Sequence, residues 1–316
     1  MNIKDLKPGD ILLFSAEKGS FISWAITYLT DASVSHAAMY YDDKEKSIIE
    51  ETPPQVTTNN ADKRFKGRKI NVRRLKEDLP LDPVIEASKS YLNDNEPYDN
   101  SGLYIVGLLL MYKKFTPDSL VQRAMVKILK KITASIVKYL EKHQYPDKSP
   151  MVCSQFVAQC YAKAGGKYKL KIEHGVLQKT ATNQIDRNNN IIGQVMQIIE
   201  NGERSHLQAL LTPNLKIQDD SSLSGEELCK ELKDAFHLLS TNASSTKITD
   251  ELVEAVAQFA HAYDLSLSNP QKMNGSHHKN THEILQNISD NENMFTFPGD
   301  LLNHCDSLKD VGVIEA

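Results

Sequence analysis

Ser35-His-Ala-Ala-Met-Tyr-Tyr41 is a run of small, apolar and aromatic residues that is typical of a β-strand. Asp42-Asp43 then turns the chain, and Ser47-Ile-Ile-Glu50 returns as the antiparallel partner. His36 lies within the first strand and Glu50 on the second, and polar groups on adjacent strands can touch. The pattern therefore predicts a β-hairpin that carries an imidazole and a carboxylate.

Further strands and helices are expected around this hairpin. Pro8-Gly9 is a turn that begins a strand over Asp10–Phe14, and Arg68–Leu75 is another strand candidate. Helical spacing of apolar residues predicts helices over residues 20–30, 83–91, 119–142 and 153–164. These elements together indicate an α+β fold with an antiparallel sheet.

The helix expected over residues 119–142 is amphipathic and basic. Its apolar residues follow helical spacing from Val121 to Leu140, and six lysines and arginines have little acidic compensation. Such a helix can make peripheral contact with an anionic membrane surface. More often, such a basic face is the solvated outer side of a helix that packs on a core.

The composition shifts between residues 216 and 292, which are polar and rich in Ser, Asn and His. Ser224-x-x-Glu227 is a capping box for a helix over Leu228–Leu239, and Thr249 caps a second helix over Asp250–Tyr263. We therefore expect residues 1–215 and 293–316 to form one domain. Residues 216–292 are then a helical insertion of unknown role.

The overall composition excludes several classes of protein. Lys and Arg number 37 against 41 Asp and Glu, so the net charge of −4 argues against nucleic acid as a partner. The longest apolar run, Gly102–Tyr112, has eleven residues, whereas a membrane span needs about 20. No apolar signal-peptide region follows Met1. We expect a cytoplasmic protein, or one secreted without a signal peptide into another cell.

Metals, other cofactors and disulfides are not expected. The four cysteines are Cys153, Cys160, Cys229 and Cys305, and no two form a C-x-x-C pair. We interpret all four as reduced thiols. His277, His278 and His282 could in principle bind Zn²⁺, but the Asn and Gly residues around them favour a solvated loop.

Cys153 is the candidate nucleophile. It follows a polar break that ends at Pro150 and begins a helix, and a helix N-terminus stabilises a thiolate over a thiol. A nucleophilic cysteine also needs an imidazole, and the imidazole needs an acceptor that fixes its tautomer. His36 and Glu50 can supply both. On spacing alone, a cysteine early in a helix is more often a packed thiol, and a histidine on a strand is more often a structural core residue.

Four blocks of the chain resemble one known family, the circularly permuted NlpC-like papain-fold hydrolases of the YiiX-like group. The blocks are Pro8-Gly-Asp-Ile-Leu-Leu-Phe14, Ser35-His-Ala-Ala-Met-Tyr40, Ile48-Ile-Glu50 and Val152-Cys-Ser-Gln-Phe-Val157. The resemblance covers about residues 5–178 and 294–314. It implies a papain-like fold, with Cys153 as nucleophile, His36 as general base and Glu50 as the residue that orients His36.

Glu51 stands where relatives usually have a small residue, so it is the alternative to Glu50. Because side chains alternate along a strand, the two carboxylates should point to opposite faces, and only one can serve.

The resemblance implies a thiol hydrolase that cleaves an amide bond in a peptide-like substrate through an acyl-enzyme. A second hypothesis is a lipid-directed acyltransferase, phospholipase or thioesterase of the lecithin–retinol acyltransferase-like type, which would take an acyl substrate at a membrane surface. Such proteins use a second histidine where this chain has Glu50. A third hypothesis is a binding module with an idle triad. The oligomeric state is not indicated.

Overall fold

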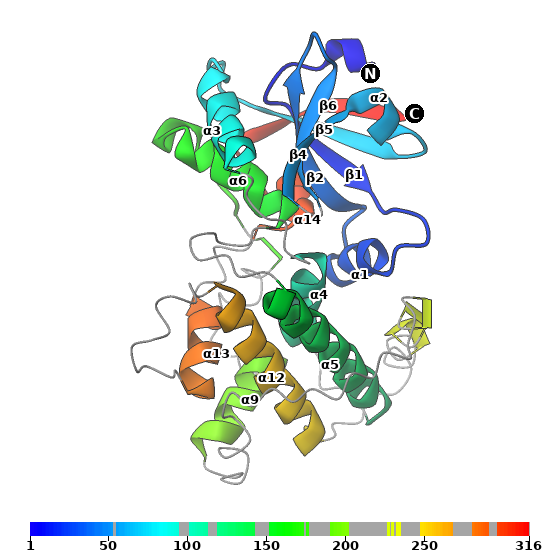
Figure 1. Ribbon diagram of the computed structural model, residues 1–316, viewed down its shortest axis with the longest axis vertical. Coiled ribbons are helices and arrows are strands. Elements are labelled where there is room, and N and C mark those ends of the chain that lie inside the picture. The colour runs from blue at the N-terminus through cyan, green and yellow to red at the C-terminus, as the bar shows by residue number, and fades with distance from the viewer. Residues whose placement is uncertain are drawn as a thin grey trace. The chain divides into compact units, whose positions relative to one another are not determined.

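The protein is represented by a computed structural model (Figure 1). The structure describes residues 1–52, 55–94, 101–112, 119–142, 152–173, 175–176, 190–201, 226–227, 229–230, 232–234, 247–267, 280–290 and 296–315. The chain forms two compact units. Unit 1 comprises Met1–Gly102, Pro150–Gln178 and Met294–Ala316, and unit 2 comprises Leu103–Ser149 and Lys179–Asn293.

Unit 1 is built on an antiparallel sheet, which confirms the expected α+β class. Its strands, in the order β4-β3-β2-β1-β5-β6, form a six-stranded sheet within the described residues. The strands are β1 (Ile11–Ser15), β2 (Val34–Asp42), β3 (Ser47–Thr52), β4 (Gln55–Asn60), β5 (Lys69–Leu75) and β6 (Leu308–Glu315). The predicted hairpin is β2–β3, with Met39 opposite Ile49. The sequence did not predict β4.

Alternation along the strands gives the sheet two buried faces. On β1, Ile11 and Leu13 face one core and Leu12 and Phe14 face the other. The first core is covered by helix α6 (Cys153–Lys163), which contributes Phe156, Val157, Cys160 and Tyr161. The second core is covered by the short helix α2 (Ala61–Phe65), through Ala61 and Phe65.

The remaining elements of unit 1 are short and follow local signals. Helix α1 (Phe21–Thr30) begins after Ser20, whose Oγ accepts a hydrogen bond from the Ser23 N–H (3.2 Å). Its C-cap residue is Asp31, which has a left-handed backbone (φ 53°). The others are α3 (Asp82–Asn93), α14 (Pro298–Asn303) and the 3₁₀ turns η1 (Ile3–Asp5) and η2 (Gly166–Tyr168).

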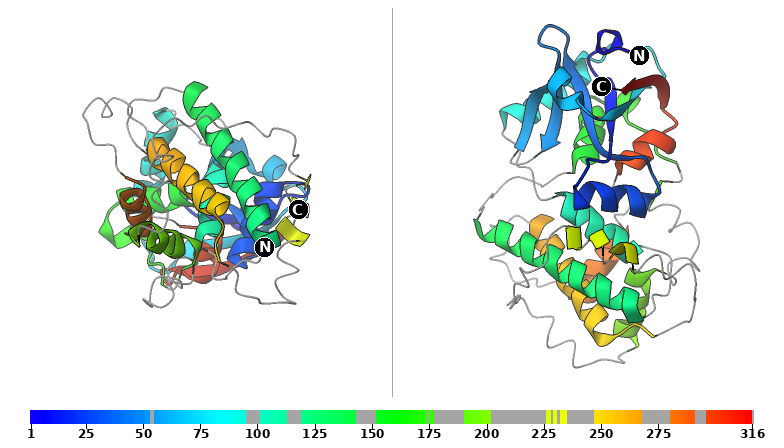
Figure 2. Two further views of the ribbon diagram at one scale, coloured as in Figure 1. Left: turned by 90° about the horizontal axis from the view of Figure 1, so that it is seen from below. Right: turned by 90° about the vertical axis from the view of Figure 1, so that its right-hand side faces the viewer.

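Unit 2 is helical in its described residues. Its helices are α4 (Ser101–Tyr112), α5 (Ser119–Lys142), α9 (Ile191–Glu200), α12 (Asp250–Leu267) and α13 (Thr281–Asp290). Helices α5 and α12 pack on each other, as both views of Figure 2 also show. The buried Gln122 amide links α5 to the residues just before α12, because it donates to the Lys247 carbonyl (3.1 Å) and accepts from the Thr249 N–H (2.8 Å).

The packing of unit 2 differs from the domain boundaries expected from composition. Residues 103–149, which composition places in the main domain, lie in the same compact unit as the whole of the expected insertion 216–292. The apolar stripe of α5, including Met125 and Ile132, is buried, while Arg123 and Lys130 are exposed. Most of the helix expected over Leu228–Leu239 lies outside the described residues.

The structure also addresses membrane insertion. Over the part of the chain that it describes, no helix combines the length and the hydropathy needed to cross a bilayer.

Replacing Gly107 with valine should destabilise unit 2. A Cβ at Gly107 would lie 2.3 Å from Cε2 of Phe259, so the buried ring of Phe259 would have to move. Overpacking of this kind costs about 1–3 kcal/mol, which a urea titration can measure. Gly166→Val is the control, because a Cβ there meets nothing within 4 Å. Equal unfolding free energies for the two variants would contradict the contact between α4 and α12.

Candidate active site

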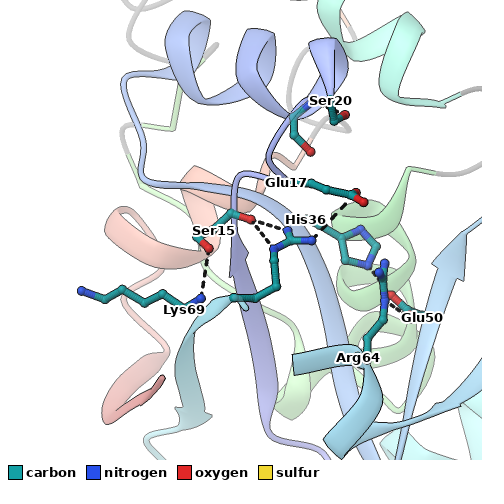
Figure 3. A network of polar contacts seen from close by, with 9 residues as sticks. Ser15, Glu17, Ser20, His36, Glu50, Arg64 and Lys69 are labelled. Atoms are coloured by element: carbon teal, nitrogen blue, oxygen red, sulfur yellow. Dashed lines mark hydrogen bonds and ion pairs between the residues drawn. The ribbon is translucent and has the colours of Figure 1, made fainter. Parts of the chain in front are cut away.

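The β2–β3 hairpin brings the predicted imidazole and carboxylate together. His36 Nε2 lies 2.5 Å from Glu50 Oε2. The register places Met39 opposite Ile49, so His36 and Glu50 are diagonal neighbours on one face of the two strands. The Glu50 side chain is fully buried and that of His36 is 16% exposed. Figure 3 shows both side chains at this end of the hairpin.

Glu50 is held by a second set of partners through its other oxygen. Arg64 Nε–H donates to Glu50 Oε1 (2.7 Å), and Asn59 Nδ2–H donates to the same oxygen (2.9 Å). Burial by itself would raise the pKa of Glu50, but the hydrogen bonds and charges of His36 and Arg64 lower this pKa to about 2. The carboxylate is therefore ionised throughout the physiological range.

Cys153 is the first residue of α6, and its thiol lies close enough to His36 for each group to shift the pKa of the other. Burial would raise the pKa of Cys153, but the charge and hydrogen bond of His36 outweigh it. Backbone hydrogen bonds from Ala37 and Ser154 also lower this pKa. Burial lowers the pKa of His36, yet Cys153 and Glu50 raise it to about 9. These opposite shifts favour a thiolate–imidazolium pair.

Two hydrogen bonds fix α6, and with it Cys153, against unit 1. Ser154 Oγ donates to the carbonyl of Thr296, in the segment that leads into α14. Near the other end of the helix, Tyr161 Oη donates to the Gly9 carbonyl (2.6 Å), just before β1. The apolar side chains of Phe156 and Val157 fill the sheet face between them. The position of the thiol is thus set by packing along the whole helix.

Sequence reasoning missed three residues that surround the pair. Asn59 lies on β4 and Arg64 on α2, two elements that the sequence did not predict. Phe14 is the cross-strand partner of His36, and the two ring centroids are 5.4 Å apart. The available signal was alternation: Asn59 lies opposite Ile48 and Thr57 opposite Glu50, so all four side chains share one face.

The structure distinguishes Glu50 from Glu51. His36 contacts Glu50, whereas the Glu51 side chain is buried on the other face of β3, close enough to Cys160 to influence its thiol. Burial, followed by the charge of Glu51, raises the pKa of Cys160 well above its usual value. The alternation expected from the sequence is therefore present.

The other cysteines have different environments. All four cysteines are free thiols. Burial raises the pKa of Cys160, Cys229 and Cys305, and Cys153 alone among the four has a lowered pKa.

Within the described ranges, no group of three His, Cys, Asp or Glu side chains could hold a metal ion. His277 and His278 lie outside these ranges, and His282 Nε2 lies 2.7 Å from Glu200 Oε1.

Comparisons with known proteins add little to this geometry. No protein-family model matches the chain, and no curated protein matches it. Among solved structures, metalloprotein YiiX from Escherichia coli O157:H7 (DUF1105) is a weak neighbour with a TM-score of 0.32 and 16% sequence identity. The match covers 59% of this chain and 86% of that chain. A similarity of this size does not define the fold or the activity of this chain.

Iodoacetamide at about pH 6.5 should alkylate Cys153 before the other three thiols, because the thiolate is the reacting form and only Cys153 has a lowered pKa. Mass spectrometry after limited labelling measures the order. His36→Ala removes the charge and hydrogen bond that lower this pKa, so it should slow labelling of Cys153 by about tenfold or more. Labelling of Cys229 at the same rate as Cys153 would contradict the assignment.

Proposed function

We propose that this chain is a thiol hydrolase with a circularly permuted papain-like domain. In this proposal Cys153 is the nucleophile, His36 the general base and acid, and Glu50 the residue that orients His36. The observation that carries it is the His36 imidazole, which contacts the buried Glu50 carboxylate and lies close enough to the Cys153 thiol at the start of α6 to lower the pKa of that thiol. The antiparallel sheet with the cysteine helix on one face supports the papain-like assignment.

The proposed reaction has two steps. The Cys153 thiolate attacks the carbonyl carbon of the substrate, and the carbon–sulfur bond forms as the carbonyl π electrons move to oxygen. As this intermediate collapses, the His36 imidazolium gives its proton to the leaving amine and the carbon–nitrogen bond breaks. Water then attacks the thioester, His36 accepts its proton, and the acid is released with the thiolate restored.

Charge on the carbonyl oxygen needs hydrogen-bond donors. The backbone N–H of Cys153 is suited to this role, because the first N–H groups of a helix have no intrahelical partner and the positive end of the helix dipole lies there. During the reaction Glu50 keeps the His36 ring in one orientation and stabilises the imidazolium, without itself taking a proton.

An amide of a peptide-like substrate is the bond we propose, as the family resemblance implies. The lipid-directed alternative was suggested by the apolar run in α4 and by the basic helix α5. In the structure, the described apolar side chains of α4, such as Leu109, are buried, as is the apolar stripe of α5 that includes Ile128, whereas Leu120 at the start of α5 is exposed.

Glu50→Gln should lower turnover of a hydrolysed amide by at least about 100-fold, because loss of the orienting carboxylate leaves His36 in the wrong tautomer or position. Glu51→Gln is the matched control and should retain nearly full turnover per folded molecule. The measurement is hydrolysis of a panel of aminoacyl and γ-glutamyl amides, with Cys153→Ala as the blank. The reverse pattern would transfer the role to Glu51. Turnover of fatty-acyl esters but of no amide would favour the lipid-directed alternative.

A further inference from the structure

Arg64 lies over the buried end of the site. It belongs to α2, which begins directly after β4, with Asn60 as its N-cap: the Lys63 N–H donates to Asn60 Oδ1 (3.1 Å). Phe65, the next residue, is fully buried in the core on that side of the sheet, so it anchors the helix. The anchored helix places the Arg64 guanidinium beside Glu50, as Figure 3 shows.

The contacts of Glu50 are divided between its two oxygens. Oε1 accepts from Arg64 and Asn59, and Oε2 lies against His36. A carboxylate held at both oxygens cannot rotate about its last bond without losing a charged partner. Because the Glu50 side chain is fully buried, water cannot replace a lost partner, and an unpaired charge at this depth is costly.

Arg64 is itself held in place by an aromatic ring. Its guanidinium carbon lies 5.7 Å from the centroid of Phe14, within the range of a cation–π contact. The same ring lies beside the His36 imidazole. Phe14 therefore packs against both charged partners of Glu50. The Arg64 side chain is 29% exposed, so it covers the carboxylate on the solvent side.

We infer that Arg64 is a positioning residue, which holds the Glu50 carboxylate with Oε2 turned toward His36 and so fixes the imidazole against Cys153. This inference rests on the proposed function. The chain of groups then alternates in charge: thiolate, imidazolium, carboxylate, guanidinium. Two further charged groups lie close by, since Glu17 and Arg68 both act on this cluster electrostatically.

Loss of Arg64 should shift the ionisation of the Cys153 thiol in one direction. Without the guanidinium, Glu50 takes a proton more readily and is less firmly oriented, so His36 stabilises the Cys153 thiolate less. Arg64 also acts on Cys153 directly through its charge. Both effects raise the pH at which the thiol ionises. Lysine would keep the charge but not the planar guanidinium, so it should rescue only in part.

Arg68 is the matched control. Its guanidinium carbon lies 5.5 Å from the centroid of the same Phe14 ring. Its Nε–H donates to the Ser15 carbonyl (3.0 Å), and its Nη1 lies 3.9 Å from Glu17 Oε2. It is therefore an arginine in a similar packing environment that contacts Ser15 and Glu17 instead of Glu50. Arg68→Gln removes a charge from this region without removing the contact that the inference concerns.

The experiment is the pH dependence of Cys153 alkylation by iodoacetamide in the full chain, with thermal unfolding followed in parallel. Arg64→Gln should move the midpoint of the alkylation profile up by about one pH unit, so that labelling at about pH 6.5 slows roughly tenfold. Arg64→Lys should lie between this variant and the unmodified chain. Arg68→Gln should move the midpoint much less than Arg64→Gln does, because Arg68 acts on Glu50 through its charge alone and makes no hydrogen bond to it among the described contacts. A merely structural role for Arg64 would lower the melting temperature and leave the midpoint in place.

The outcomes separate this inference from the proposal on which it rests. If the unmodified chain shows a low alkylation midpoint that depends on His36, and Arg64→Gln has the same midpoint, the positioning role is overturned and the hydrolase proposal stands. If the unmodified chain shows no such His36-dependent reactivity, the proposed function itself fails. If the Arg64→Gln variant does not fold, the Arg64→Lys variant is the test of the positioning role. An alkylation midpoint in Arg64→Lys equal to that of the unmodified chain would then overturn the inference.

Discussion

The buried carboxylate of Glu50 is the constraint on which the site depends. An ionised group at zero exposure is tolerated only where partners compensate for the water that it has lost. Those partners come from three separate elements, β2, β4 and α2, through His36, Asn59 and Arg64. The requirement to satisfy one side chain therefore fixes how the hairpin, the next strand and the short helix meet. Replacing it by an apolar residue would remove that requirement and the only acid partner of His36 among the described contacts.

The nucleophile depends on a different kind of constraint, which is packing. Cys153 reaches His36 because α6 is held at Ser154 and at Tyr161 and because its apolar face fills one side of the sheet. The thiol thus approaches from one core, while the carboxylate is anchored in the other core. His36, near the start of β2, is the group that both reach. Rigid elements on both faces position such a site more closely than loops would.

Much of the site could be predicted from the sequence, because it follows from patterns within one short stretch of the chain. Period-two alternation separates Glu50 from Glu51, and a single hairpin determines which strand faces which. Arg64 could not be found in this way, because one arginine among the basic residues around it carries no periodic signal. The two compact units divide the chain differently from the domains expected from composition, for a related reason. The apolar stripe of α5 shows that one face is buried, but it does not show that α12 is the partner.

The position of β6 has a consequence for synthesis of the chain on the ribosome. Its partner β5 ends at Leu75, but β6 begins only at Leu308, so this edge of the sheet has no partner until the chain has been synthesised beyond residue 308. At about 5–20 residues per second, this interval lasts on the order of 10–50 s. An open edge strand invites association with other nascent chains. Lys69, Arg73 and Arg74 on β5 supply charges of one sign, which discourage such pairing during this interval.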